Sequence, residues 1–173
     1  MFLKIIGCLA ILTASSGYGL AKGLEYKRQV EEMSAIERII WQLRGEITYM
    51  KAPLPDVFRR VGGRLKNPYR EWLYVLSEEL KGCGKENFQQ IWERVTREKL
   101  RGISLPKSEW DELLRLGGQM RYLDIRMQEM ALDWYGNQMQ GREAAMREVL
   151  EQKRKLFAYL GVMGGAFLVI LLI

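Results

Sequence analysis

The sequence predicts an all-α protein, in which a helical bundle is flanked by N- and C-terminal transmembrane helices. Two long stretches repeat apolar residues at alternating spacings of three and four, as in a helix packed lengthwise against another helix. No stretch alternates strictly between apolar and polar residues with hairpin signals at its ends, so strands are not indicated. Both ends of the 173-residue chain are strongly apolar and the middle is charged, which indicates one domain with an apolar segment at each end.

The N-terminal apolar segment, residues 5–21, is rich in small residues and follows the single cation Lys4. This composition fits a spanning helix or a signal peptide that is later removed. Lys22 follows the segment directly, and positive charge at that place resists translocation. We therefore predict an uncleaved anchor over residues 1–22, and cleavage is the open alternative.

The first long stretch predicts a helix whose apolar residues form one line, here named the first apolar stripe: Met33, Ile36, Ile40, Leu43, Ile47 and Met50. Ser34 and Glu37 do not supply a helix start signal. We therefore expect this helix to continue from the N-terminal segment.

Two of the four prolines, Pro53 and Pro55, interrupt the helical pattern together. Proline removes a backbone donor and pushes the residue before it toward an extended conformation, so Ala52 and Leu54 should end the first helix. Pro55 suits the first position of the next helix, and Asp56 complements the positive end of that helix dipole. The stretch predicts a sharp corner between two helices.

Three shorter amphipathic helices are predicted next, over residues 55–65, 68–80 and 86–100. Glycines stand where helix ends favour a residue that tolerates positive φ: Gly62, Gly63, Gly82, Gly84 and Gly102.

Pro106 suits the first turn of a long helix that follows. This helix carries the second apolar stripe, which we expect to pack on the first: Leu113, Leu116, Met120, Leu123, Met127, Met130 and Trp134. The pattern weakens at Gly136 and Gly141. We therefore expect a hinge or bend there, before a final helix that leads into the C-terminal segment.

The C-terminal segment, residues 156–173, contains no charge and is long enough to cross a bilayer as a helix. Lys153, Arg154 and Lys155 precede it, and cations beside a span favour the cytoplasmic side. With Lys22 on the same side, both termini face outward and the middle faces the cytoplasm. The predicted organisation is an N-terminal transmembrane anchor (1–22), a cytoplasmic helical domain (23–155) and a C-terminal transmembrane helix (156–173).

The composition argues against catalysis. The chain has no histidine, which is the usual proton shuttle near neutral pH and the commonest metal ligand. Its two cysteines, Cys8 and Cys83, are too few for a metal cluster or a disulfide framework. Residues 81–86 (KGCGKE) lack the first glycine and the Ser or Thr of a phosphate-binding loop. We expect no enzyme activity, cofactor, metal or small-molecule substrate, although a Ser-Lys nucleophile pair stays open.

The net charge of +6 does not indicate nucleic-acid binding. Lysine and arginine alternate with acidic residues along most of the middle, which is typical of solvated helix faces, whereas phosphate binding favours concentrated basic clusters. We expect no nucleic-acid partner.

Three segments carry a resemblance to a known family. They are AIERIIWQLRGEITYMKAPLPDVFRRVG (35–62), LGGQMRYLDIRMQEMALDWY (116–135) and EQKRKLFAYLGVMGGAFLVILLI (151–173). With the short N-terminal anchor, they resemble the stage III sporulation protein AB family of endospore-forming bacteria, over nearly the whole chain. The middle is also similar to the cytoplasmic helical domain of type II secretion inner-membrane platform proteins.

The resemblance implies a component of the channel between mother cell and forespore, held in the outer forespore membrane with its helical domain in the mother-cell cytoplasm. The implied partners are a secretion-type ATPase, stage III sporulation protein AA, and other membrane proteins of the same complex. The implied function is a noncatalytic platform that docks this ATPase and couples it to the membrane complex. We predict partner contacts at these residues: Glu46, Tyr49, Pro53, Pro55, Asp56, Arg121, Asp124 and Arg126.

Two other functions stay open from the sequence. One is a membrane-anchored regulator or sensor that positions a cytosolic signalling partner. The other is an extracytoplasmic binding module released from a cleaved signal peptide, which would reverse the predicted topology.

Overall fold

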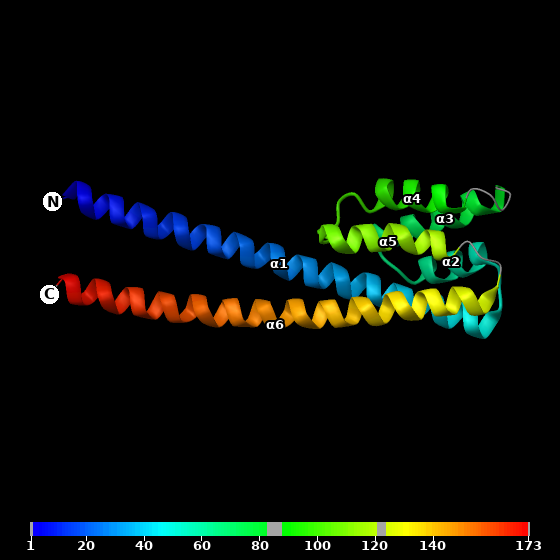
Figure 1. Ribbon diagram of the computed structural model, residues 1–173. Coiled ribbons are helices and arrows are strands. Elements are labelled where there is room, and N and C mark those ends of the chain that lie inside the picture. The colour runs from blue at the N-terminus through cyan, green and yellow to red at the C-terminus, as the bar shows by residue number, and fades with distance from the viewer. Residues whose placement is uncertain (1, 83–87, 121–123, 173) are drawn as a thin grey trace. The chain divides into compact units, whose positions relative to one another are not determined.

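The computed structural model describes the backbone of residues 2–82, 88–120 and 124–172 (Figure 1). Within these ranges the side chains are described except at 2–22, 153–155 and 157–172. Helices joined by short turns make up the described residues, and no strand occurs among them. The all-α prediction is therefore confirmed.

The described helices follow one another as α1 (Phe2–Met50), α2 (Leu54–Gly63), α3 (Tyr69–Gly82), α4 (Phe88–Lys99), α5 (Lys107–Met120) and α6 (Ile125–Leu172). They divide into two compact units. The core unit, Glu32–Arg142, holds the four short helices and the adjoining parts of α1 and α6. The terminal unit comprises residues 1–31 and 143–173. The core unit lies within the predicted domain 23–155.

The terminal unit contains both predicted membrane segments. Their backbone is helical, as expected, because α1 begins at Phe2 and α6 ends at Leu172. Their side chains, and those of Lys22, Lys153, Arg154 and Lys155, lie outside the described residues. Where side chains are described, no helix offers a stretch long and apolar enough to cross a bilayer. The two transmembrane helices remain predictions.

One indole organises the short helices of the core unit. The ring of Trp92 on α4 lies 5.3 Å from the Trp72 ring of α3, edge-on, and 6.1 Å from the Phe58 ring of α2, between centroids. Its Nε1 donates a hydrogen bond of 2.8 Å to the Leu113 carbonyl oxygen of α5. Because Trp92 is fully buried, this hydrogen bond satisfies a donor that would otherwise be costly. One side chain therefore connects α2, α3, α4 and α5.

Gly117 makes room for this indole. A Cβ added at Gly117 would lie 2.3 Å from Trp92 Cδ1, a distance that real contacts do not reach. Gly63 and Gly82 end α2 and α3, as predicted, but the expected positive φ is wrong, because none of the described glycines has one. At Gly117 the absent side chain, rather than backbone freedom, is what the fold uses.

Prolines mark the helix starts. The carbonyl oxygens of Pro53, Pro68 and Pro106 accept hydrogen bonds of 3.0–3.2 Å from the backbone N–H four residues later, at Val57, Trp72 and Trp110. Each proline therefore stands immediately before its helix. Pro55, predicted at the first position of its helix, occupies the second, because α2 begins at Leu54.

The first apolar stripe is confirmed except at its last member. Met33, Ile36, Ile40, Leu43 and Ile47 are all buried, whereas Met50 is exposed at the end of α1. The prediction that this helix continues from the N-terminal segment is also confirmed, since α1 runs unbroken from Phe2 to Met50. At the other end of the core unit, the Tyr69 hydroxyl of α3 donates a hydrogen bond to Glu32 Oε2 of α1.

The second apolar stripe does not belong to one helix. Leu113, Leu116 and Met120 are buried on α5, which ends at Met120. The chain then starts a new helix at Ile125, and the exposed members of the stripe are Met127, Met130 and Trp134, while Leu123 lies outside the described residues. The break rotates the buried face of α6 away from the predicted one. Leu132, Tyr135 and Met139 are buried instead.

The predicted hinge at Gly136 and Gly141 is wrong, because α6 continues through both. Gly136 serves a close approach, since a Cβ there would lie 2.8 Å from Trp41 Cζ2 of α1. In the core unit, Arg44 Nε of α1 also lies 2.5 Å from Asp133 Oδ1 of α6. These two contacts place α1 and α6 side by side and antiparallel (Figure 1).

We expect Gly117→Ala to lower the free energy of unfolding by at least about 1 kcal/mol, because the forced displacement of Trp92 outweighs the better helix propensity of alanine. Gly118→Ala is the matched control. A Cβ at Gly118 meets only the end of the Gln89 side chain, at 3.3 Å, so this change should be neutral or stabilise by up to about 1 kcal/mol. Urea unfolding followed by tryptophan fluorescence measures both. Equal effects of the two changes would contradict the assigned role of Gly117.

Candidate functional site

The corner between α1 and α2 is held by its backbone. Lys51 adopts a left-handed conformation (φ 48°), and its N–H donates to the Ile47 carbonyl oxygen at 3.1 Å, which closes the end of α1. Pro53 is extended (φ −57°, ψ 146°) and precedes α2. Asp56 stands in the first turn of α2, where its charge complements the helix dipole. The predicted corner is therefore present, one residue earlier than expected at the start of α2.

The Glu46 side chain stabilises this corner. Its side chain is only 13% exposed, and its Oε1 lies 2.9 Å from Arg64 Nη2, just beyond the end of α2. The ion pair fastens α1 to the far end of α2. The sequence predicted that Glu46 is an exposed contact residue. In the structure its carboxylate is mostly buried and pairs with Arg64 of the same unit.

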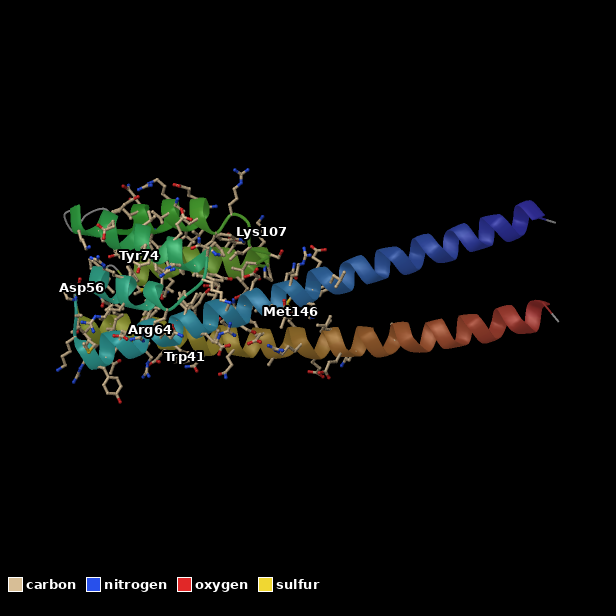
Figure 2. All side chains as sticks on the ribbon, turned by 180° about the vertical axis from the view of Figure 1, so that it is seen from behind. Trp41, Asp56, Arg64, Tyr74, Lys107 and Met146 are labelled. Carbon is tan, nitrogen blue, oxygen red and sulfur yellow. The ribbon has the colours of Figure 1, made fainter. Side chains whose placement is uncertain are left out.

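Other predicted contact residues of the corner are open to solvent. The Tyr49 side chain is 88% exposed, and Pro53 and Asp56 are also exposed. Pro55 is half-buried. Figure 2 shows Asp56 at the outer edge of the core unit, whereas Arg64, just beyond the other end of α2, lies further in. An exposed tyrosine next to a rigid proline turn is a typical protein-contact feature.

The second predicted contact group begins α6. Asp124 caps this helix, because its Oδ1 accepts a hydrogen bond of 3.0 Å from the Arg126 N–H and its carbonyl accepts one of 3.2 Å from Gln128 N–H. Asp124 and Arg126 are exposed, and Arg121 lies outside the described residues. The sequence signal for this cap was an aspartate directly before Ile125, which the assumption of one long helix concealed.

The structure brings the two groups to one end of the core unit. Since α1 and α6 run antiparallel, the end of α1 at Met50 and the start of α6 at Ile125 lie at the same end of the pair (Figure 1). Four of the exposed residues there are named the corner surface: Tyr49, Pro53, Asp56 and Arg126. This surface offers an aromatic ring, a carboxylate and a guanidinium, which together suit contact with a folded protein.

A buried ionic cluster between α5 and α6 was missed from the sequence. Glu109 is 3% exposed, and its Oε1 accepts a hydrogen bond of 2.9 Å from Arg142 Nη1. Arg142 Nη2 also donates to Gln138 Oε1. Burial raises the pKa of the neighbouring Tyr135 phenol, and the charge of Glu109 raises it further. No spacing rule connects two residues 33 positions apart, so only the fold reveals this cluster.

Residues suited to a metal are not gathered anywhere in the described chain: no group of three histidine, cysteine, aspartate or glutamate side chains there is placed to hold an ion. Most described carboxylates of the short helices instead pair with cations, as Glu71 does with Lys99 at 2.8 Å and Glu112 with Arg115 at 2.7 Å.

The fold defines a class of all-α protein in which four short helices follow one long helix in the chain and precede another. The two long helices lie side by side in the core unit. Residues 4–173 match the family model of stage III sporulation protein AB, and the chain belongs to that family. A solved structure described as stage III sporulation protein AB is similar to this chain, with a TM-score of 0.62 and 20% sequence identity. The match covers 72% of this chain and 97% of that one, and supports the fold. No match was found among the curated proteins.

We expect Arg142→Met to lower the free energy of unfolding by about 3 kcal/mol, because it leaves the buried Glu109 carboxylate without its cation. The double variant Glu109→Gln with Arg142→Met should recover most of this loss, since it buries no unpaired charge. Thermal or urea unfolding of the unaltered chain, of Glu109→Gln, of Arg142→Met and of the double variant completes a double-mutant cycle.

Arg115→Met is the matched control for this cycle. Arg115 is 63% exposed in its pair with Glu112, so its loss should cost less than about 1 kcal/mol. If Arg142→Met were as mild as Arg115→Met, the cluster would not contribute to stability as described.

Proposed function

We propose that this chain is a noncatalytic membrane platform of the channel between mother cell and forespore, which docks a secretion-type ATPase and couples it to the membrane complex. Membership of the stage III sporulation protein AB family gives the chain a role in sporulation. The ATPase we propose is stage III sporulation protein AA, together with other membrane proteins of the same channel as neighbours.

The corner surface is the observation that carries the proposal. Glu46, next to it, is held by Arg64, and Lys51 and Pro53 fix the backbone of the turn. Tyr49 and Asp56 are nevertheless exposed. A rigid turn that presents an exposed tyrosine has little conformational entropy to lose on binding, which favours a docking surface.

The two apolar ends support anchoring in the outer forespore membrane. Residues 5–21 and 156–173 are apolar in sequence and helical in backbone, and cations flank them at Lys22 and at 153–155. In the proposed topology both ends span the bilayer and the core unit faces the mother-cell cytoplasm.

Coupling would be mechanical. Arg126 of the corner surface lies in the first turn of α6, and this helix continues without interruption into the C-terminal apolar segment. A force applied by the ATPase to the start of α6 would be passed along a hydrogen-bonded helix toward the membrane, through residues 153–155. The chain itself needs no catalytic group for this role.

A second function is favoured by the same exposed corner: a membrane-anchored regulator or sensor that positions a cytosolic signalling partner. The two functions differ in the identity of the partner. Binding of the ATPase to the corner surface therefore decides between them.

We expect the combined change Asp56→Lys with Arg126→Glu to weaken binding of stage III sporulation protein AA at least about tenfold, because it reverses two charges on the corner surface. Pull-down with the purified ATPase measures this loss, and circular dichroism checks that helix content is kept. Asp124 is avoided because it caps α6.

The matched control is Asp111→Lys, which changes a carboxylate that is also exposed, on α5 outside the corner surface. It should leave binding unchanged. Loss of binding in the control, or full binding by the corner variant, would show that the ATPase does not dock at the corner surface. If the unaltered chain did not bind the ATPase, the result would favour the regulator or sensor function.

A further inference from the structure

One short segment of the core unit carries nearly all of the net charge of the chain. Residues 51–70 contain six lysine and arginine residues and a single carboxylate, that of Asp56, so this segment has a net charge of +5. The whole chain has a net charge of +6, so the residues outside this segment are together close to neutral. The alternation of cations and anions found along the rest of the middle therefore stops at α2.

Three exposed cations of this segment lie close to the corner. Lys51 is in the turn before α2, and Arg59 and Arg60 are on the helix itself. The buried side of α2 is formed by Val57, Phe58, Val61 and Gly62. Arg59 and Arg60 are on the opposite side of the helix, at spacings of three and four from Asp56. Lys51, Arg59 and Arg60 are named the basic face.

The fold does not use the charges of the basic face. Within the described chain, the side chains of these three cations make no hydrogen bond and no ion pair. Other arginines of the core unit are paired, as Arg64 is with Glu46 and Arg94 is with Glu79. Like charges that are held together without counter-charges repel one another. A partner that supplies carboxylates would remove this repulsion.

Two exposed carboxylates beside the basic face indicate what kind of partner fits. Asp56 precedes Arg59 and Arg60 on the same side of α2. Lys81 is the main cause that holds the pKa of the Glu78 carboxyl of α3 below its usual value, and Arg59 adds to the lowering. Both carboxylates would repel the phosphates of a nucleic acid or a lipid surface. A folded protein can place carboxylates opposite the arginines and a cation opposite Asp56.

The basic face is continuous with the corner surface. Asp56 belongs to the corner surface and shares the exposed side of α2 with Arg59 and Arg60. Lys51 stands between Tyr49 and Pro53 in the chain. A protein that contacts the corner surface therefore also meets the basic face.

We propose that the basic face binds an acidic surface of the ATPase that docks at the corner. This inference rests on the proposed function and adds the chemistry of the matching surface, which is a group of aspartate and glutamate side chains. The guanidinium groups of Arg59 and Arg60 can each bind a carboxylate through two parallel hydrogen bonds. The positive field of residues 51–70 also speeds the encounter with an acidic protein.

The salt dependence of binding tests the electrostatic part of this proposal. The affinity of purified stage III sporulation protein AA for the full chain in a mild detergent is measured at increasing concentrations of sodium chloride. We expect the affinity to fall at least about tenfold between about 0.1 M and about 1 M salt, because the screening length falls from about 10 Å to about 3 Å. An affinity that does not change with salt would overturn the proposal.

Charge reversal tests the location of the contact. The combined change Arg59→Glu with Arg60→Glu should weaken binding of the ATPase at least about tenfold, whereas Arg59→Lys with Arg60→Lys keeps both charges and should retain most of the affinity. The matched control is Arg97→Glu with Arg101→Glu, the same change of charge at two exposed cations outside the basic face. It should change the affinity less than about threefold. Circular dichroism checks that all variants keep their helix content.

The outcomes separate this inference from the proposed function. Full binding by the Arg59→Glu, Arg60→Glu chain would overturn the inference and leave docking at the corner surface standing. Failure of the unaltered chain to bind the ATPase would overturn both. The basic face would have a different occupant if the unaltered chain bound a single-stranded oligonucleotide, or phosphatidylglycerol in mixed micelles, more tightly than the ATPase and the charge reversal abolished that binding. This result would also overturn the proposal.

Discussion

The burial of Trp92 against Gly117 is the constraint on which the core unit depends. The indole contacts α2 and α3 through aromatic rings and α5 through a hydrogen bond to the Leu113 carbonyl. It fits only because position 117 has no side chain. A second indole–glycine contact, Trp41 on Gly136, sets α1 against α6. Two glycines therefore determine how closely the helices of the core unit approach, and the exposed surfaces follow from that packing.

One of those surfaces is the corner surface, at one end of the core unit. The corner surface mixes Tyr49 and Pro53 with the charges of Asp56 and Arg126. On α6, the side chains of Met127, Met130 and Trp134 are also exposed. Helix α6 contributes to both groups, since Arg126 and Met127 are consecutive residues.

Much of this fold could be predicted from local physics, and the errors have identifiable causes. Buried periodicity located the first apolar stripe, and proline chemistry located the corner, because both effects act within a few residues. The prediction that the second apolar stripe lies on one helix was wrong, because periodicity alone does not show that Asp124 caps a new helix. In this new helix Met127 is exposed to solvent. The sequence predicted the corner between the two helices, but not the ion pair of Glu46 with Arg64. Such contacts depend on tertiary packing and have no sequence spacing of their own.

The central claim is that two apolar ends hold the core unit at the cytoplasmic face of a membrane. Thiol labelling with a membrane-impermeant reagent tests this claim most directly. The reagent is added to intact non-sporulating cells that express the chain. Each chain carries one introduced cysteine in a background where Cys8 and Cys83 are serine. The account predicts that Asp56→Cys is labelled only after the cells are opened, whereas Phe2→Cys is labelled from outside. Labelling of Asp56→Cys in intact cells would contradict the topology and the docking of a cytosolic ATPase with it.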